Sequence, residues 1–293
     1  MRFLSIGECM VEMAPDGAGK FSMNYAGDTF NTAWYLRKLT DPANEVAYLT
    51  AVGEDEISDQ MLDFIAKSGI DTAEITRIPN RSVGLYMILL NNGERRFSYW
   101  RSVAAAKLLA RGRTELPQAD LIYFSGITLA ILAEGDRDHF LNLITQARAN
   151  GAKIAFDPNM RPRLWADAET MRHEILRGAG AADIVLPSAD EETVHFGDTS
   201  PEATRERYLK AGAATVIVKN GPGRVAAADP KGNVTFEPDI VAKVVDSTAA
   251  GDSFNAGFLA AYLAGDDLQT AIDKGAKVAA QVVQNYGALV ELR

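Results

Sequence analysis

The segment that most restricts the fold of this 293-residue chain is Asp246-Ser-Thr-Ala-Ala-Gly-Asp-Ser-Phe254. It places two aspartates around small residues, directly before a helical apolar pattern that continues through Phe258, Leu259 and Tyr262. Small residues at a helix start let an anion approach backbone N–H groups that lack a helical partner, and the helix dipole favours negative charge there. The segment therefore predicts a helix whose first turn binds phosphate.

Asp252 falls in the first turn of this predicted helix. A carboxylate at that position can accept the proton of a substrate hydroxyl. The neighbouring N–H groups of Ala249, Ala250 and Gly251 can stabilise the charge that develops on a transferring phosphoryl group. A lone aspartate there would commonly only cap the helix. The second aspartate and the small-residue hinge favour the catalytic interpretation.

Short apolar runs alternate with helical patterns along the chain. The strand-like runs are 3–6, 46–52, 121–124, 153–156, 184–186 and 215–218, and the helical patterns include 29–39, 57–68 and 136–150. This alternation predicts an α/β protein with a mostly parallel sheet and helices on both faces. In such sheets ligands bind at the carboxyl ends of strands. Asp157, Ser188 and Lys219 follow three of these ends, which indicates one shared crevice.

Residues 82–101 interrupt the alternation. Asn92-Gly93 between two strand-like runs is a strong hairpin signal. A turn there pairs Asn91 with Glu94, places Tyr86 opposite Tyr99, and places Gly84 opposite Arg101. The period of two then puts one set of side chains on a single face: Gly84, Tyr86, Ile88, Phe97, Tyr99 and Arg101. This face suits a small polar ligand, although a solvated face of an edge hairpin explains the same pattern.

The segment 246–254 resembles the second signature of the ribokinase-like (phosphofructokinase B type) sugar kinases. The similarity extends to segments 7–12, 26–33, 125–130 and 157–165, which look like the 2-keto-3-deoxygluconate kinase branch of that family. The resemblance covers nearly the whole chain. It implies a single ribokinase-like domain over residues 1–293, with three αβα layers and a small β-sheet lid formed by residues near 8–14 and 82–101.

The same resemblance assigns the sugar-binding residues. Gly27, Asp28 and Asn31 match the first family signature, whose residues bind sugar hydroxyls. Asp28 as a helix cap, with Asn31 in the first turn, is a sufficient structural account of this segment without a ligand. In the hairpin, the residues that match sugar-contacting positions are Tyr86, Tyr99 and Arg101.

Asn159 and Arg161 follow a predicted strand between prolines that fix the backbone. The resemblance places them between the nucleotide phosphates and the sugar acid. Arg161 and Arg101 together indicate a carboxylate substrate, because an arginine fork matches the two oxygens of a carboxylate. Surface ion pairs are the alternative explanation for both arginines.

The nucleotide side is also assigned by resemblance. Glu191 matches a glutamate that organises Mg²⁺ and phosphates through water, while Ser188 stands where the family usually has asparagine and could equally cap a helix. A strand end carrying a cation and two glycines would let the backbone approach ATP: Lys219, Gly221 and Gly223. Similar kinases often bind K⁺ near Asp246 and Thr248, where simple turn formation competes as an explanation.

Other classes of protein fit poorly. The segment 219–224 lacks the third glycine of a dinucleotide fingerprint, and 17–20 lacks the flanking residues of a Walker loop. A single cysteine excludes an internal disulfide, and three scattered histidines give no zinc spacing. The formal charge of −9 argues against a nucleic-acid surface. Without a bilayer-length apolar run or a signal-like N-terminus, we expect a cytoplasmic protein that does not enter membranes.

The expected reaction is ATP plus 2-keto-3-deoxy-D-gluconate giving ADP and 2-keto-3-deoxy-6-phosphogluconate, with Asp252 as base and Mg²⁺ on the phosphates. A neutral sugar such as fructose or ribose is the alternative substrate. A hydrolase built on 251–254 would need a histidine base in a recognisable context, which the sequence lacks. A non-catalytic sugar-acid sensor would not need an intact Asp252. An exposed lid edge predicts pairing with another subunit.

Overall fold

A computed structural model of the chain describes residues 1–17, 19–91 and 94–292. Its main sheet has eight strands. Their order is β14 (Gly232–Phe236), β13 (Val225–Asp229), β12 (Thr215–Val218), β11 (Ile184–Val185), β10 (Lys153–Asp157), β9 (Leu121–Ser125), β1 (Arg2–Ile6) and β4 (Glu45–Leu49). The strands from β12 to β4 pair in parallel, and β13 and β14 pair antiparallel. The predicted mostly parallel sheet is confirmed.

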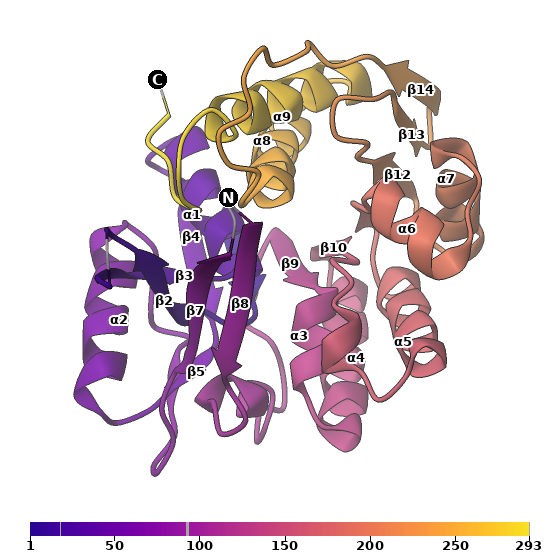
Figure 1. The fold of residues 1–293 in the computed structure, drawn as a ribbon. Helices are drawn as coiled ribbons and strands as arrows, with labels where there is room; N and C mark the ends of the chain where they lie inside the picture. Colours follow the sequence, from indigo (N-terminus) through magenta and orange to yellow (C-terminus); the bar gives the residue numbers. More distant parts are fainter. Residues whose placement is uncertain (18, 92–93, 293) are drawn as a thin grey trace.

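Helices cover both faces of this sheet, because its strands are apolar on both sides. In β9, Leu121 and Tyr123 belong to one buried cluster, and Ile122 and Phe124 belong to the other. The first cluster includes α1 (Asp28–Leu39), α2 (Glu56–Lys67), α8 (Ala250–Leu263) and α9 (Leu268–Val282). The second includes α3 (Gly126–Ile131), α4 (Glu134–Ala149), α5 (Ala168–Gly180), α6 (Ala189–Phe196) and α7 (Pro201–Lys210). The result is the predicted three-layer arrangement (Figure 1).

A second, four-stranded sheet forms the lid at the edge of the main domain. Its order is β3 (Phe21–Ala26), β2 (Met10–Pro15), β7 (Gly84–Asn91) and β8 (Glu94–Trp100). The predicted lid segments 8–14 and 82–101 contain three of these strands. The fourth, β3, was not predicted. It pairs antiparallel with β2, and beyond the last pair the Asp16 N–H donates to the Lys20 carbonyl at 2.9 Å.

The predicted register of the lid hairpin is confirmed. Tyr86 pairs with Tyr99, and the pairing continues from Leu85–Trp100 to Asn91–Glu94. Arg101 follows the last residue of β8, so its expected pairing with Gly84 is not part of the ladder. The predicted turn residues Asn92 and Gly93 lie outside the described residues.

The single strand expected over 46–52 was wrong. The chain leaves the main sheet after β4, and β5 (Ala51–Val52) pairs with β6 (Thr76–Arg77) in a separate two-stranded sheet. Thr50 between them is buried, so the apolar run in the sequence gives no signal of the break. The described residues also form two short 3₁₀ helices: η1 (Ala105–Leu108) and η2 (Pro162–Leu164).

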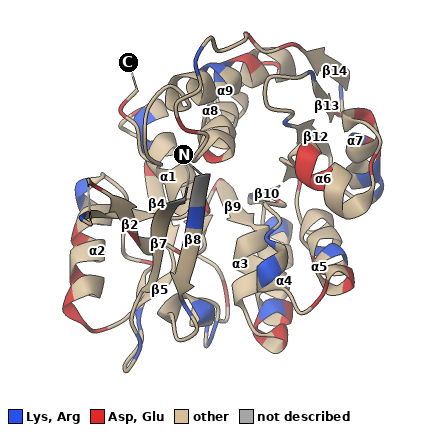
Figure 2. Ribbon diagram, in the orientation of Figure 1, with Lys and Arg blue, Asp and Glu red and all other residues tan. Residues whose placement is uncertain are grey.

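Charged residues are distributed along the outer helices. Figure 2 shows acidic and basic segments interspersed over the ribbon, as expected from 39 acidic and 30 basic side chains. Within the part of the chain that the structure describes, no helix has both the length and the apolar character needed to cross a bilayer.

Candidate active site

A cavity of 1410 Å³ lies between the lid and the carboxyl ends of the main-sheet strands. This volume exceeds that of a typical single-ligand pocket, about 300–1,000 Å³, and leaves room for two ligands. Its walls bring together most of the predicted site residues: Gly27, Asp28, Asn31, Tyr86, Tyr99, Arg101, Asn159, Arg161, Ser188, Glu191, Lys219, Thr248, Ala249, Ala250, Gly251 and Asp252. The shared crevice predicted from strand ends is therefore present in the fold.

The start of α8 has an unusual backbone. Ala249, the residue before the helix, has φ 58° and ψ 16°, which is the left-handed region that residues other than glycine rarely adopt. Such conformations cost about 1–3 kcal/mol and cluster at functional sites. The first-turn residues Gly251 and Asp252 follow directly. The Ala250 N–H already donates to the Ser247 carbonyl at 3.2 Å, which reduces the number of donors expected to face an anion.

Asp252 is half-buried and accepts a hydrogen bond at Oδ2 from Asn31 Nδ2 at 2.8 Å. Burial and the nearby Asp28 carboxylate raise the pKa of Asp252 to about 7, although the Asn31 hydrogen bond opposes this shift. A general base is most effective when its pKa lies near the working pH. The predicted base therefore has a suitable pKa and a fixed orientation.

The start of α1 explains why residue 27 is glycine. A Cβ on Gly27 would lie 2.1 Å from the Glu8 carbonyl oxygen, so no larger residue fits. Gly27, not Asp28, is the residue that precedes the helix, and the expected cap role of Asp28 was wrong by one position. Asn31 Oδ1 accepts from the Gly27 N–H at 3.3 Å, so the Asn31 amide links this junction to Asp252.

Asp28 instead faces Asn159 across the cavity. Asn159 Nδ2 donates to Asp28 Oδ2 at 2.7 Å, and the Asn159 N–H donates to Asp157 Oδ1 at 3.0 Å. Asn159 has φ 30°, a second strained backbone position among the lining residues. Burial raises the pKa of Asp28, and hydrogen bonds from Ser125 and Asn159 counteract that shift. The two aspartates 28 and 252 thus share one enclosed acidic region.

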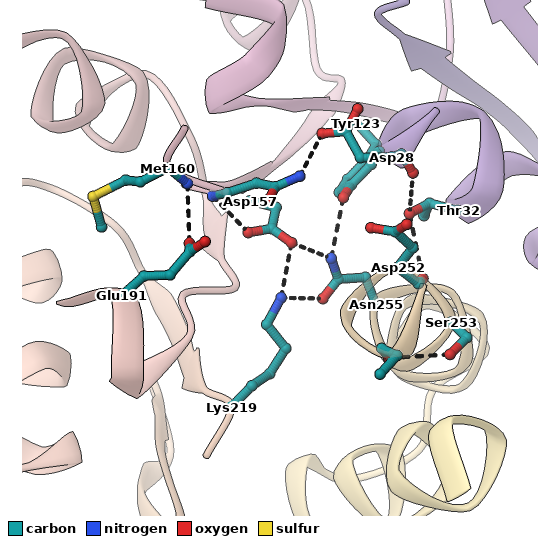
Figure 3. Close-up of polar contacts among 12 residues, drawn as sticks. Asp28, Thr32, Tyr123, Asp157, Met160, Glu191, Lys219, Asp252, Ser253 and Asn255 are labelled. Atoms are coloured by element: carbon teal, nitrogen blue, oxygen red, sulfur yellow. Dashed lines mark hydrogen bonds and ion pairs between the residues drawn. The ribbon is translucent and has the colours of Figure 1, made fainter. Parts of the chain in front are cut away.

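Both candidate carboxylate-binding arginines already have acidic partners. Arg161 Nη1 lies 2.6 Å from Glu191 Oε1. Figure 3 shows the second contact of this carboxylate, in which Glu191 Oε2 accepts from the Met160 N–H at 3.0 Å. Burial raises the pKa of Glu191, while Arg161 lowers it. Arg101 forms an ion pair with Glu8, whose carboxylate is buried and has one oxygen without a hydrogen-bond partner among the described residues.

Aromatic rings of the lid lie beside Arg101. Tyr86 and Tyr99 have ring centroids 5.9 Å apart, and the Arg101 guanidinium carbon lies 5.9 Å from the Tyr99 centroid. The Tyr86 hydroxyl donates to Glu12. These contacts place the predicted tyrosines and arginine on the same cavity wall, and they add Glu8 and Glu12 as acidic neighbours that the sequence did not single out.

On the nucleotide side, Ser188 occupies the expected cap position before α6, but its hydroxyl makes no capping hydrogen bond. Lys219 is buried and ion-paired with Asp157 at 2.8 Å. Gly221 and Gly223 lie in the tight turn between β12 and β13 and do not line the cavity. Residue 221 has φ 53°, in the left-handed region that favours glycine.

Asp246 and Thr248 form a local turn. Asp246 Oδ1 accepts from the Thr248 N–H at 3.0 Å and from its hydroxyl at 2.7 Å, and Asp246 Oδ2 accepts from the Gly287 N–H at 2.9 Å. These bonds hold the chain that leads to α8. These hydrogen bonds agree with the explanation that Asp246 and Thr248 stabilise a turn.

Several polar residues at the site had no signal in the sequence. Asn255 and Tyr123 are buried and lie next to the Asp157–Lys219 pair, and the Thr32 hydroxyl donates to the Asp252 carbonyl at 3.3 Å. Each of them sits within an apolar helix or strand pattern, and the partners are far away in the sequence. Only the small and polar composition of 252–257 could have drawn attention to Asn255.

Asp252 lies at a strained helix start, in a covered cavity that is large enough for two small molecules, and this is the arrangement that a small-molecule kinase of the α/β class needs. The family model described as pfkB family carbohydrate kinase matches residues 2–292. The chain therefore belongs to the pfkB family of carbohydrate kinases.

Individual proteins agree with this classification. The chain is 38% identical to the 2-dehydro-3-deoxygluconokinase of Escherichia coli strain K12, over 97% of this chain and 96% of that protein. The crystal structure of a PfkB protein from Polaromonas sp. JS666 is 27% identical and superposes with a TM-score of 0.86, covering 97% of this chain and 96% of that one. A putative ribokinase II from Escherichia coli, solved with ATP and Mg²⁺, is 25% identical with a TM-score of 0.84, covering 98% and 94%.

Proposed function

We propose that this protein transfers the γ-phosphoryl group of ATP to the 6-hydroxyl of 2-keto-3-deoxy-D-gluconate, giving 2-keto-3-deoxy-6-phosphogluconate and ADP. The observation that carries the proposal is that Asp252 shares one cavity with Arg101 from the lid and Arg161 from the loop after β10. The similarity to 2-dehydro-3-deoxygluconokinases supports the same substrate, which has a carboxylate. We infer that the enzyme works in the cytoplasm, where ATP is available.

In this proposal Asp252 accepts the hydroxyl proton as the hydroxyl oxygen attacks the γ-phosphorus. Asn31 keeps the carboxylate aimed through its 2.8 Å hydrogen bond. The backbone N–H groups of Ala249 and Gly251 stabilise the charge on the transferring group, and Ala250 would join them if its N–H gave up the 3.2 Å bond to the Ser247 carbonyl. Phosphoryl transfer depends mainly on positioning and electrostatics. Orientation can contribute roughly 7–11 kcal/mol, so closure of the lid matters at least as much as the base.

The sugar acid would lie between the lid and α1. Gly27, Asp28 and Asn31 would contact its hydroxyls, and Tyr86 and Tyr99 would cover it. Arg101 would hold its carboxylate: a guanidinium has five N–H donors, and the bond to Glu8 uses Nη2 only, so a second edge can serve the ligand. Arg161 would contact both the sugar acid and the phosphates.

ATP and Mg²⁺ would occupy the opposite end of the cavity. Glu191 fits a magnesium-organising role because its carboxylate is held at the cavity wall by Met160 and Arg161 and keeps further lone pairs. When bound, Mg²⁺ neutralises phosphate charge. The nucleotide contacts we propose are Asn159, Arg161, Ser188, Gly221 and Gly223, together with the start of α8. Of these, only the two glycines are not part of the cavity wall. Lys219, which the family resemblance also assigned to the nucleotide, is already paired with Asp157.

A monovalent cation, K⁺, is a further proposal for the turn of Asp246 and Thr248, where it would order the chain before α8. Replacing KCl by choline chloride in the assay tests it. A drop in turnover that KCl restores supports the proposal, and equal rates in both salts remove it.

The lid also suggests a dimer. Its edge strand β8 carries three exposed aromatic residues, Phe97, Tyr99 and Trp100, with exposed fractions of 40%, 50% and 57%. An exposed strand edge with apolar side chains readily pairs with another chain. We propose that two copies associate through this sheet. Sedimentation should show a dimer that Trp100→Glu converts to a monomer, and an unchanged mass would exclude this interface.

A neutral sugar is the second candidate substrate. Its support is that Arg101 and Arg161 already have carboxylate partners, Glu8 and Glu191, so neither charge requires an acidic ligand. ADP release with ATP, Mg²⁺ and a panel of 2-keto-3-deoxygluconate, fructose, ribose or no sugar separates the two. Turnover on the keto acid alone supports the first proposal, turnover on fructose or ribose supports the second, and no turnover on any would favour a sensor.

A further inference from the structure

A closed ring of buried polar contacts lies directly beneath the start of α8. Lys219 Nζ contacts Asp157 Oδ2 at 2.8 Å and Asn255 Oδ1 at 3.1 Å, and Asn255 Nδ2 donates to the same Asp157 oxygen at 2.6 Å (Figure 3). The exposed fractions are 8% for Lys219, 3% for Asp157 and 0% for Asn255. A lysine this buried is unusual. It is stable here because the Asp157 carboxylate neutralises its charge and the Asn255 amide oxygen accepts a hydrogen bond from it.

Four separate elements hold this ring in place. Asp157 ends β10, Lys219 follows β12, and Asn255 lies in α8, where its amide also donates to the Tyr123 hydroxyl of β9 at 3.1 Å. The backbone of Lys219 is fixed as well, because its N–H donates to the Pro187 carbonyl and its carbonyl accepts from Ala189, both at 2.8 Å. The lysine therefore cannot swing out to follow a ligand without breaking these bonds.

The ammonium of Lys219 lies close to the catalytic turn. A Cβ built on Gly251 would be 3.5 Å from Lys219 Nζ. Asn255 lies three residues after Asp252 on α8. The ring of polar contacts is therefore bonded to the same helix that carries the base. In a buried site, charges at this range interact much more strongly than in water.

We propose that Lys219 is a positioning residue: a fixed cation, held by Asp157 and Asn255, that anchors the first turn of α8 and keeps Asp252 ionised, rather than a side chain that grips the nucleotide. This proposal rests on the proposed function, because it takes Asp252 as the base. The family resemblance assigned Lys219 to nucleotide binding. In this proposal Lys219 instead supports the backbone N–H groups that bind the anion.

The charged groups around Asp252 act in opposite directions. The carboxylates of Asp28 and Asp157 raise the pKa of Asp252, and the Lys219 ammonium lowers it. Among the described residues, Tyr35, Tyr123 and Arg161 also interact electrostatically with Asp252. Since Asp157 and Lys219 are paired and have opposite effects, their substitutions should shift the ionisation of Asp252 in opposite directions.

The test compares the pH profile of kcat/KM in three variants. Lys219→Met should move the acidic limb to higher pH by about one unit, which is about tenfold less activity at a pH below the limb. Asp157→Asn should move it to lower pH. The double variant removes both charges, leaves no buried ion unpaired, and should place the limb near that of the wild type. Lys210→Met, which removes an exposed lysine of α7, is the matched control and should leave the profile unchanged.

A second readout does not depend on the substrate. Carboxyl ¹³C resonances of the ligand-free protein can be followed with pH, and the Asp252 signal is assigned by its loss in Asp252→Asn. Lys219→Met should raise the midpoint of that signal even if the substrate proves to be a neutral sugar, so failure of the proposed function remains distinguishable. An unchanged midpoint would overturn the proposal, and at least a tenfold loss of ATP affinity by calorimetry in the same variant would return Lys219 to nucleotide binding.

Discussion

Two sides of the cavity, the lid and the start of α8, hold their polar side chains by different means. On the lid, Tyr99 is 50% exposed and Arg101 pairs with one carboxylate at the end of a strand. Beneath α8, Asp157 and Asn255 are 3% and 0% exposed and share a closed ring of bonds with Lys219. The side chains of the lid can therefore move around a ligand, whereas the side chains beneath α8 are already held in place by hydrogen bonds.

This difference matches the two tasks of a kinase. A sugar site must open and close, which favours exposed aromatic rings and single ion pairs. A phosphoryl-transfer site gains most when its charges are fixed before the reaction, because no reorganisation is then needed. Substitutions near α8 should therefore reduce kcat, and substitutions on the lid should mainly raise KM.

The largest effect is expected for Asp252→Asn. The amide cannot accept the substrate proton, so turnover should fall by a factor of about 10²–10⁴ while both ligands still bind. Steady-state rates and calorimetric titrations measure the two quantities. Asp266→Asn, in the connection between α8 and α9 and ion-paired with Lys274, is the control. Near-normal turnover in Asp252→Asn would remove this residue from the mechanism and leave the α8 side without a catalytic group.

Arg101→Ala tests the other side of the comparison. A hydrogen bond to a charged group contributes about 1.5–3 kcal/mol, so KM for the keto acid should rise by roughly ten- to a hundredfold with little change in kcat. Arg77→Ala, which breaks an exposed pair with Asp59, is the matched control. If KM for the keto acid stayed the same, the lid arginine would serve only as the counter-ion of Glu8.

Gly27→Ala probes the junction between the two sides. The added Cβ would lie 2.1 Å from the Glu8 carbonyl, and relieving this overlap should cost about 1–3 kcal/mol of folding free energy. Urea unfolding measures the loss. Gly135→Ala in the first turn of α4, where a Cβ meets nothing within 4 Å, should leave stability equal or slightly higher. Equal stability of both variants would mean that the junction is not rigid.

The sequence predicted the phosphate-binding start of α8 from a single local motif, because the candidate base and the small residues beside it are consecutive in Asp246–Asp252. It also predicted the lid hairpin, since pairing from a turn fixes the register of Tyr86 and Tyr99. In both cases the information is contained within a short stretch of chain.

The residues that were missed depend on partners far away in the sequence. Asn255 contacts Asp157 across 98 positions, and Arg101 contacts Glu8 across 93. A polar residue inside an apolar pattern gives no sign of such a partner until the chain folds. Strand β3 was missed for a related reason: four of its six residues are not buried, so it has little apolar pattern.

The smallest effect tests the acidic region that joins the two sides. Burial and then the Asp28 carboxylate raise the pKa of Asp252, so the folded enzyme needs a higher pH to ionise its base than an isolated aspartate would. The rate should therefore fall as the pH drops through about 7. Asp28→Asn removes the repulsion, which should lower the acidic limb of kcat at saturating sugar by a fraction of a unit to about one unit. A limb that stayed in place would mean that the Asp28 charge does not contribute to the pKa of Asp252, and that the α1 side of the cavity binds sugar without influencing the base.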